Sequence, residues 1–295
     1  MSHKTKGIQC IIGSAFCFAL MNLFVNLAGD LPVIQKAFFR NAVALVFSAV
    51  ILFRTTTKDD RRIGKDNFWL LSLRSLAGGI GFVCNFYAVD RMNISDASML
   101  NKLAPFFVII FSAIFLREKA NLFQWGAVIL AFAGSLFIVK PTFGMEVVPA
   151  VAGLVGGLGA GIAYTCVRKL GQIGTKSAFV VFYFSAFTSL LLGPIVLFQY
   201  VPMKWWQWVF LLLTGLAASG GQFCVTAAYK YAAAKDISVY DYSQVLFAAI
   251  LGFFFLNQKP DVFSFVGYTI IIGVAIAVYL KQHHDAKNDC SAKKV

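Results

Sequence analysis

The sequence predicts an all-α integral membrane protein of ten transmembrane helices, built as two inverted-topology five-helix repeats with the N- and C-termini inside. Three observations predict this class. The 295 residues are 59% hydrophobic and only 13% charged, whereas a soluble domain is near 45–50% apolar and about 25% charged. The apolar residues form ten runs long enough to cross a bilayer, and the two halves of the chain resemble each other.

A membrane-crossing helix needs about 20 apolar residues to cover roughly 30 Å of hydrocarbon. Continuous runs of this length favour helices over a β-barrel, whose strands alternate over about ten residues. The first run has no small-residue cleavage site after it, so we expect a span there and not a signal peptide. The ten predicted spans are 8–27, 34–53, 68–89, 97–116, 122–139, 147–167, 178–200, 206–229, 238–256 and 262–280.

Lys and Arg in the loops predict the orientation, because loops on the inner side of a membrane carry an excess of both. Of the 26 Lys and Arg residues, four lie within spans. With the N-terminus inside, 18 of the other 22 lie on the inner side, and ten spans return the tail to that side. The net charge of +13 is therefore better explained by membrane orientation than by nucleic acid, and we expect no nucleic-acid partner. The outer loops hold only Arg91, Lys140, Lys204 and Lys259.

A shift of 140 positions aligns identical residues in the two halves. Because five spans per half is an odd number, the repeats must have opposite topology, as in many secondary transporters that bind substrate near the midplane. We therefore expect one repeat over 7–140, a second over 147–280 and a polar cytoplasmic tail over 281–295. The matched pairs are Gly81 and Gly221, Cys84 and Cys224, Ala88 and Ala228, Asp96 and Asp236, Ser98 and Ser238, Phe115 and Phe255, Leu116 and Leu256, Lys119 and Lys259, and Phe123 and Phe263.

Two segments between Leu73 and Glu118 carry a family resemblance. "LRSLAGGIGFVCNFYAV" and "ISDASMLNKLAPFFVIIFSAIFLREK" resemble the third and fourth helices of EamA-type members of the drug/metabolite transporter (DMT) superfamily, and "KAFFRNAVAL" resembles their second helix. The likeness covers about 7–280. "AFFR" and "YDYSQVLFAAILGFFFLNQKPD" resemble the S-adenosylmethionine transporter branch. The resemblance implies a ten-helix carrier that works by alternating access on metabolites such as amino acids or nucleotide-like compounds.

The second repeat departs from this family pattern at two positions. It has Val245 where the first repeat has Pro105, and Gln258 where the first repeat has Glu118. The departures put in question whether the two halves contribute equally to the site.

Charged residues within the spans are the first candidates for a site, because each costs about 2.5–3.5 kcal/mol at the membrane centre. They are Arg40, Arg74, Lys102 and Asp241, whereas Lys36 lies near a helix end and can snorkel. At 1.5 Å per residue, Lys102 and Asp241 lie on opposite sides of the midplane. We therefore expect Asp241 to pair with Arg74. Arg40 and Lys102 share the outer half of the membrane, and their positive charges favour a carboxylate- or phosphate-bearing substrate. The alternative, that the arginines join helices or contact lipid phosphates, stays open.

Polar residues at helical spacing mark the inward faces of other spans. Arg74 and Asn85 share a stripe of the third span, and Gln222 lies on the corresponding stripe of the eighth. Pro105 is expected to bend its helix, and Gly153, Gly157 and Gly161 to let a neighbouring helix pack closely on the sixth span. The predicted substrate-binding residues are Arg40, Arg74, Asn85, Asn101, Lys102, Tyr164, Gln222, Tyr240 and Gln244, with coupling or gating by Asp241 and Pro105.

The motifs that the sequence lacks narrow the function. There is no GxxxxGK[ST] loop, no His within a span and no CxxC pair among six cysteines, so we expect no cofactor, no metal site and no catalytic residue. The leading interpretation is a secondary transporter of a small organic metabolite in the cell inner (plasma) membrane, working by exchange or proton coupling, with lipids around it. A lipid-modifying membrane transferase and a channel remain alternatives, and a homodimer stays open.

Overall fold

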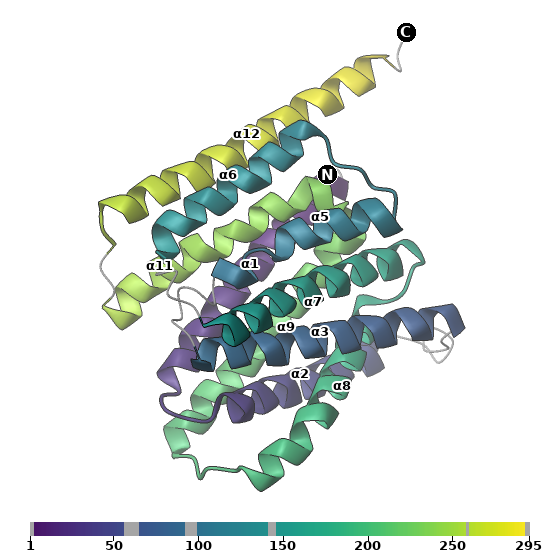
Figure 1. Ribbon diagram of the computed structural model, residues 1–295. Helices are drawn as coiled ribbons and strands as arrows, with labels where there is room; N and C mark the ends of the chain where they lie inside the picture. The colour runs from purple at the N-terminus through teal and green to yellow at the C-terminus, as the bar shows by residue number, and fades with distance from the viewer. Residues whose placement is uncertain (1–2, 56–64, 92–98, 141–145, 258–259, 293–295) are drawn as a thin grey trace.

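The computed structural model is all-helical, with no strand among the residues that it describes, which are 3–55, 65–91, 99–140, 146–257 and 260–292 (Figure 1). Within these residues, nine helices are long and apolar enough to cross a membrane, and a shorter apolar helix spans Met99–Phe115. The chain is therefore a multi-pass membrane protein, as the sequence predicts.

The helices match the predicted spans in order, and several are longer: α1 begins at His3, five residues before the predicted start, and α7 ends at Gln172, five residues after the predicted end. The ninth span begins at Ala234, four residues before its predicted start, and the last helix continues to Ala292 through most of the predicted tail. The helices are α1 His3–Leu27, α2 Val33–Thr55, α3 Lys65–Arg91, α5 Ala104–Phe115, α6 Leu122–Val139, α7 Val147–Gln172, α8 Ser177–Phe198, α9 Trp205–Tyr231, α10 Ala234–Ile237, the 3₁₀ segment η2 Ser238–Tyr242, α11 Ser243–Leu256 and α12 Val262–Ala292.

The helices form one bundle in which α6 and α12 lie side by side at one edge (Figure 1). Helix α8 lies at the opposite edge against α2. Between these edges α3 packs on α7, and α1 packs on α9. The two ends of the chain lie on the same side of the bundle, at the upper right of Figure 1.

Glycines allow α7 to approach its neighbours closely, as the sequence predicts. A Cβ atom at Gly157 would lie 2.9 Å from the carbonyl oxygen of Leu100, and one at Gly161 would overlap the Cβ of Phe107. On another face of α7, a Cβ at Gly159 would lie 2.6 Å from the carbonyl oxygen of Ala77 in α3. The close approach brings α3, α5 and α7 into direct backbone contact and so fixes the positions of the side chains between them.

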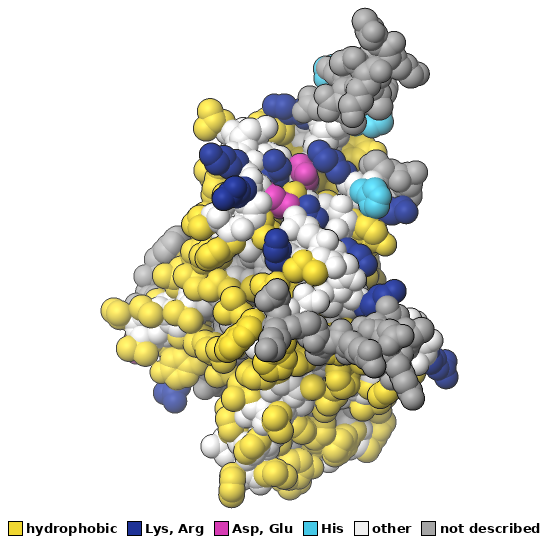
Figure 2. All heavy atoms as spheres, turned by 90° about the vertical axis from the view of Figure 1, so that its right-hand side faces the viewer, with side chains coloured by type: hydrophobic (Ala, Val, Ile, Leu, Met, Phe, Trp, Pro, Cys, Tyr) yellow, Lys and Arg dark blue, Asp and Glu magenta, His cyan; other side chains and the backbone are white. Residues whose placement is uncertain are grey.

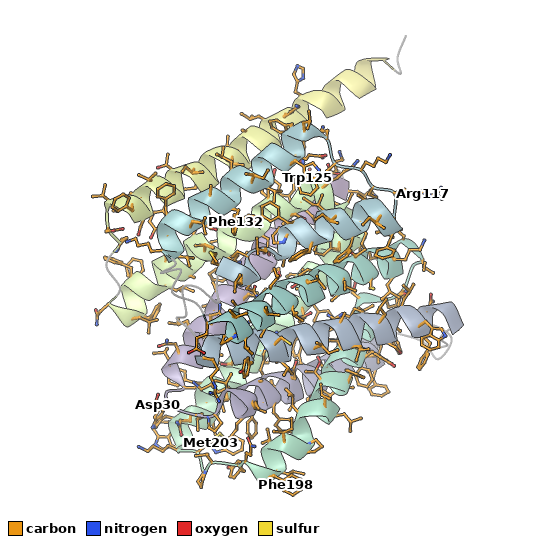
Figure 3. The ribbon with its side chains drawn as sticks, in the orientation of Figure 1. Asp30, Arg117, Trp125, Phe132, Phe198 and Met203 are labelled. Carbon is orange, nitrogen blue, oxygen red and sulfur yellow. The ribbon has the colours of Figure 1, made fainter. Side chains whose placement is uncertain are left out.

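The surface of the bundle is strongly apolar, as expected of helices that face lipid. Phe198 is 91% exposed and Leu122 is 90% exposed. Asp30 and Arg117 lie at opposite ends of the bundle, while Trp125 and Phe132 lie on the side of α6 that faces α5 (Figure 3). Figure 2 looks onto the end with the α5–α6 turn, where Lys and Arg side chains are spread over the surface and Asp and Glu are few.

Candidate substrate-binding site

Two spans are interrupted inside the bundle, and their interruptions meet. The fourth span turns at Lys102 and Leu103 and restarts as α5, while the ninth passes from α10 through η2 before α11 begins. The Tyr242 hydroxyl in η2 donates to the carbonyl oxygen of Lys102 at 2.9 Å. Broken helices at membrane depth are tolerated where protein or a wet cavity satisfies their backbone groups, and in transporters they commonly form the binding site.

Pro105 lies at the start of α5, buried, and does not bend a continuous helix as expected. Its fixed φ suits the first turn of a helix, where its missing N–H leaves no hydrogen bond unmade. Pro105 therefore marks the place where the fourth span is interrupted.

Lys102 and Asp241 form an ion pair at this junction, which corrects the expectation that they lie apart. The Lys102 Nζ is 3.7 Å from Oδ2 of Asp241 and donates to Oε1 of Gln244 at 2.7 Å. Among the described residues Arg74 makes no ion pair, so its expected pairing with Asp241 is wrong. The depths expected from the predicted helix starts were wrong for two reasons. The ninth span starts at Ala234 and not at residue 238, so Asp241 lies deeper in the membrane than predicted. The long Lys102 side chain also extends toward Asp241.

Within the part of the chain that the structure describes, Arg74 is the largest fully buried side chain, with 2% of its surface exposed. Its Nη2 donates to Oε1 of Gln222 at 3.0 Å, and its guanidinium lies 3.7 Å from the centre of the Phe184 ring. Its Nε and Nη1 have no hydrogen-bond partner among the described residues. Since an unsatisfied buried donor costs about 1–3 kcal/mol, and more when charged, two free N–H groups here favour a ligand.

Arg40 is also buried, at 5% exposure, and its contacts are with neutral groups. Its Nη1 donates to Oδ1 of Asn41 and its Nε to the sulfur of Met21, both at 3.1 Å, and its guanidinium lies 5.0 Å from the Phe82 ring centre. Met21 lies one turn beyond Phe18, whose ring packs on Gly221, beside the Gln222 that accepts from Arg74. These contacts place Arg40, Arg74 and Gln222 in one region between the two halves of the chain, and Tyr164 follows Ala163, which packs on Gly78 one turn from Arg74.

The remaining predicted residues divide between this region and another part of the bundle. Asn101 donates to the side-chain oxygen of Asn85 at 3.1 Å, which joins the third and fourth spans. Tyr164 stacks on Tyr229 with ring centres 5.2 Å apart. Tyr240 is buried in η2, which packs on α1, α5, α6 and α12, whereas Arg40 and Arg74 lie on α2 and α3.

Sequence reasoning missed a second polar cluster, at the end of the bundle that carries Arg117. Oε1 of Glu118 accepts from Nε and Nη2 of Arg168, at 2.9 and 2.8 Å, and from Gln172 at 3.0 Å. Nη1 of Arg168 donates to the carbonyl oxygens of Tyr229 and Lys230 in the last turn of α9. The pair therefore connects the α5–α6 turn to α7 and α9. In the sequence, Arg168 is one of many cations beside the spans and nothing distinguishes it. Gln258, which takes the place of Glu118 in the second repeat, lies outside the described residues.

Sequence reasoning also missed Phe184, whose ring lies under the Arg74 guanidinium. An apolar residue within a long apolar span gives no sequence signal for such a role. The described residues hold no group of three or more His, Cys, Asp or Glu that would suit a metal ion. Guanidinium, ammonium and amide groups of this kind bind carboxylate or phosphate oxygens.

Comparison with known proteins identifies transporters. The model of the EamA-like transporter family matches residues 5–140 and 148–280. The pseudopaline exporter CntI of Pseudomonas aeruginosa (strain UCBPP-PA14) is 30% identical over 276 residues, covering 92% of this chain and 95% of the exporter. Solute carrier family 35 member G1 of Mus musculus is 26% identical, and the match covers 90% of this chain and 76% of the solute carrier. A riboflavin transporter of Brucella anthropi is 25% identical, and the match covers 90% of this chain and 95% of the riboflavin transporter.

The fold also matches a solved structure. A protein crystal structure aligns with a TM-score of 0.81 at 14% sequence identity. The alignment covers 95% of this chain and 98% of the chain in the crystal structure. At this identity the match shows a shared fold alone.

Proposed function

Because the chain belongs to the EamA-like transporter family, we propose that it is a secondary carrier that moves a small organic anion across the membrane by alternating access. The family and the relatives' names are those of transporters and not of enzymes. The substrate, on this proposal, bears a carboxylate or phosphate group and binds near the midplane between the two halves.

The observation that carries the proposal is the buried guanidinium of Arg74. It lies at membrane depth with two free N–H donors and no ion-pair partner among the described residues. A buried cation without a counter-charge is costly, and an anionic group of a substrate removes that cost. Lys102, at the start of α5, is already paired with Asp241, so the proposal depends on Arg74.

Helix packing supports the assignment of two inverted repeats, 7–140 and 147–280. If the first five spans exchange with the last five, the contact of α3 with α7 becomes that of α9 with α1. The contacts of α5 with α7 and of α2 with α9 become those of α11 with α1 and of α8 with α3. All six contacts are present. An inverted repeat of this kind is the usual basis for alternating access in secondary transporters.

The inner (plasma) membrane is the proposed location, with both termini inside. Both ends of the chain lie on one side of the bundle (Figure 1). The end rich in Lys and Arg (Figure 2) would then face the cytoplasm under the positive-inside rule. Asp241 is proposed to couple transport to protons or to exchange partners, with Lys102 as its partner in this conformation.

Counterflow into proteoliposomes tests the carrier assignment. Vesicles are loaded with unlabelled compound and given the labelled form of each member of a panel of amino acids, dicarboxylates, sugar phosphates, nucleotides and S-adenosylmethionine. We expect saturable uptake of an anionic member that is stimulated by the same compound inside. S-adenosylmethionine is included because the sequence resembles the S-adenosylmethionine transporter branch. Its positively charged sulfonium makes this compound less suited to a cationic site than the anionic members are.

Two outcomes would contradict the proposal. Flux that does not saturate and shows no stimulation from the opposite side would indicate a channel. Absence of exchange for every anionic compound, in vesicles whose protein is shown to be folded, would remove the anion carrier. A lipid-modifying transferase would instead change the composition of the vesicle lipids.

A further inference from the structure

The two buried arginines differ from Lys102 in one respect. The ammonium of Lys102 has a carboxylate, that of Asp241, 3.7 Å away, so the charges of this pair cancel. In the described part of the chain, the groups that contact Arg40 and Arg74 are neutral: the side chains of Asn41, Met21 and Gln222, and two aromatic rings. Among the described residues neither guanidinium has an acidic partner, so two positive charges remain uncompensated.

These two charges belong to one place in the molecule. Arg40 is seven residues from the start of α2 and Arg74 is nine from the start of α3, so at about 1.5 Å per residue both lie well inside the membrane. Their partners are neighbours: Met21, which accepts from Arg40, lies one turn beyond Phe18 in α1, and the Phe18 ring packs on Gly221, beside Gln222, which accepts from Arg74. Like charges held in one region of the bundle destabilise each other unless an anion lies near them.

We propose that the substrate carries two negative charges and that Arg40 and Arg74 each bind one of them, an inference that rests on the proposed carrier function. The substrate class is a dicarboxylate or a phosphate monoester, and not a zwitterion or a monocarboxylate. Arg74 binds through its free Nε and Nη1, and its contact with Phe184 holds the guanidinium plane in a fixed orientation.

Gln222 and Asn41 are positioning residues on this account. Each accepts a hydrogen bond from an arginine through an amide oxygen, at 3.0 and 3.1 Å. An amide oxygen orients a guanidinium without cancelling its charge, whereas a carboxylate at the same place would cancel it. The choice of amide over carboxylate therefore leaves the charge of each arginine for the substrate.

The test compares anions that differ in charge but hardly in size. Malonate, succinate, glutarate and adipate are each paired with the corresponding monoamide, and glycerol 3-phosphate with its methyl ester. Dissociation constants come from the rise of the thermal midpoint of the purified protein with ligand concentration, at matched ionic strength. We expect at least one dianion to bind roughly tenfold or more tightly than its singly charged partner. The carboxylate and phosphate pairs distinguish the two sources of charge.

Substitutions at Gln222 and Gln199 sharpen the test. Gln222→Glu keeps the shape but cancels the charge of Arg74, so the preference for the dianion should disappear. Gln222→Met, which is neutral but no longer orients Arg74, should weaken binding of both members of a pair and keep the preference for the dianion. Gln199→Glu adds the same charge at an exposed residue at the end of α8 and should also keep it. Asn41→Asp provides a second charge-cancelling variant if Gln222→Glu fails to fold.

Two results would overturn the inference: no dianion binds more tightly than its partner, or the preference survives both Gln222→Glu and Asn41→Asp. Transport separates this failure from failure of the carrier assignment. Saturable exchange of a singly charged or zwitterionic compound, with no preference for dianions, would overturn the two-charge site and leave the carrier intact.

Discussion

The ammonium of Lys102 approaches the carboxylate of Asp241 to 3.7 Å, and this pair joins the interruption of the fourth span to that of the ninth. The two residues come from different halves of the chain. Their side chains are largely buried, with 10% and 22% exposed. Any rocking of one half against the other must change this contact or carry it along intact.

Asp241→Asn should slow exchange by at least about tenfold, because the buried Lys102 ammonium loses its counter-charge, at a cost near the lower end of about 3–5 kcal/mol. If Asp241 couples transport to protons, the variant should also lose the pH dependence of the wild type. The measurement is initial counterflow from mildly acidic to mildly alkaline pH. Glu146→Gln, which alters an exposed carboxylate that makes no side-chain cap, is the control. Normal exchange of Asp241→Asn at every pH would exclude both roles.

Removing both charges of this pair should disturb folding less than removing one. Lys102→Met and Asp241→Leu each leave an unpaired buried charge, whereas the double variant leaves none. We expect the thermal midpoint of the double variant to lie above that of the less stable single variant, with a coupling of about 0.5–3 kcal/mol in the cycle. Additive effects would show that the two side chains do not interact in the folded protein.

Glu118→Gln should destabilise this conformation by about 2–4 kcal/mol, since Arg168 would keep its carbonyl contacts but lose the one carboxylate partner that it has among the described residues. The thermal midpoint in detergent measures the change. Glu146→Gln removes a carboxylate that is exposed at the start of α7 and makes no side-chain cap, so it should leave the midpoint unchanged. Equal midpoints for both variants would show that the Glu118–Arg168 contact does not contribute to stability.

Gly161→Ala should destabilise the protein by about 1–3 kcal/mol or more, because the added methyl would overlap Phe107 of α5. Gly126→Ala is the matched control, since a Cβ there meets no atom within 4 Å. The control should be neutral or slightly stabilising, because alanine favours a helix by about 1 kcal/mol over glycine. Thermal midpoints that rank the variants in the opposite order would contradict the close packing of α5 on α7.

Most of the helices could be predicted from the sequence, because a bilayer requires long apolar runs and loops collect the charges. The exceptions are informative. The interruption at Lys102 and Leu103 has Pro105 as a sequence signal, whereas η2 has none, since Val245 stands at the corresponding position. The ninth span begins at Ala234, and the four extra residues brought Asp241 to Lys102 and not to Arg74.

The candidate site was predictable where a charge lay in an apolar run, and not where an uncharged or loop residue acts. Arg40, Arg74 and Lys102 are conspicuous because charges are rare in spans. The stripe of the eighth span that contains Gln222 corresponds to that of Arg74, and the two residues form a hydrogen bond. Phe184 gave no signal among 31 phenylalanines, and Arg168 was one of many cations beside spans. Their partners depend on contacts between distant segments.

The most direct test of the account is saturable counterflow by Arg74→Met beside Lys169→Ala, which removes an exposed cation from α7. The loss of a buried charge partner costs about 2–5 kcal/mol. We therefore predict that Arg74→Met loses exchange of the anionic substrate by roughly 30-fold or more, while Lys169→Ala exchanges as the wild type does. Exchange by Arg74→Met at the wild-type rate and half-saturation would show that the buried guanidinium joins helices and does not bind the substrate.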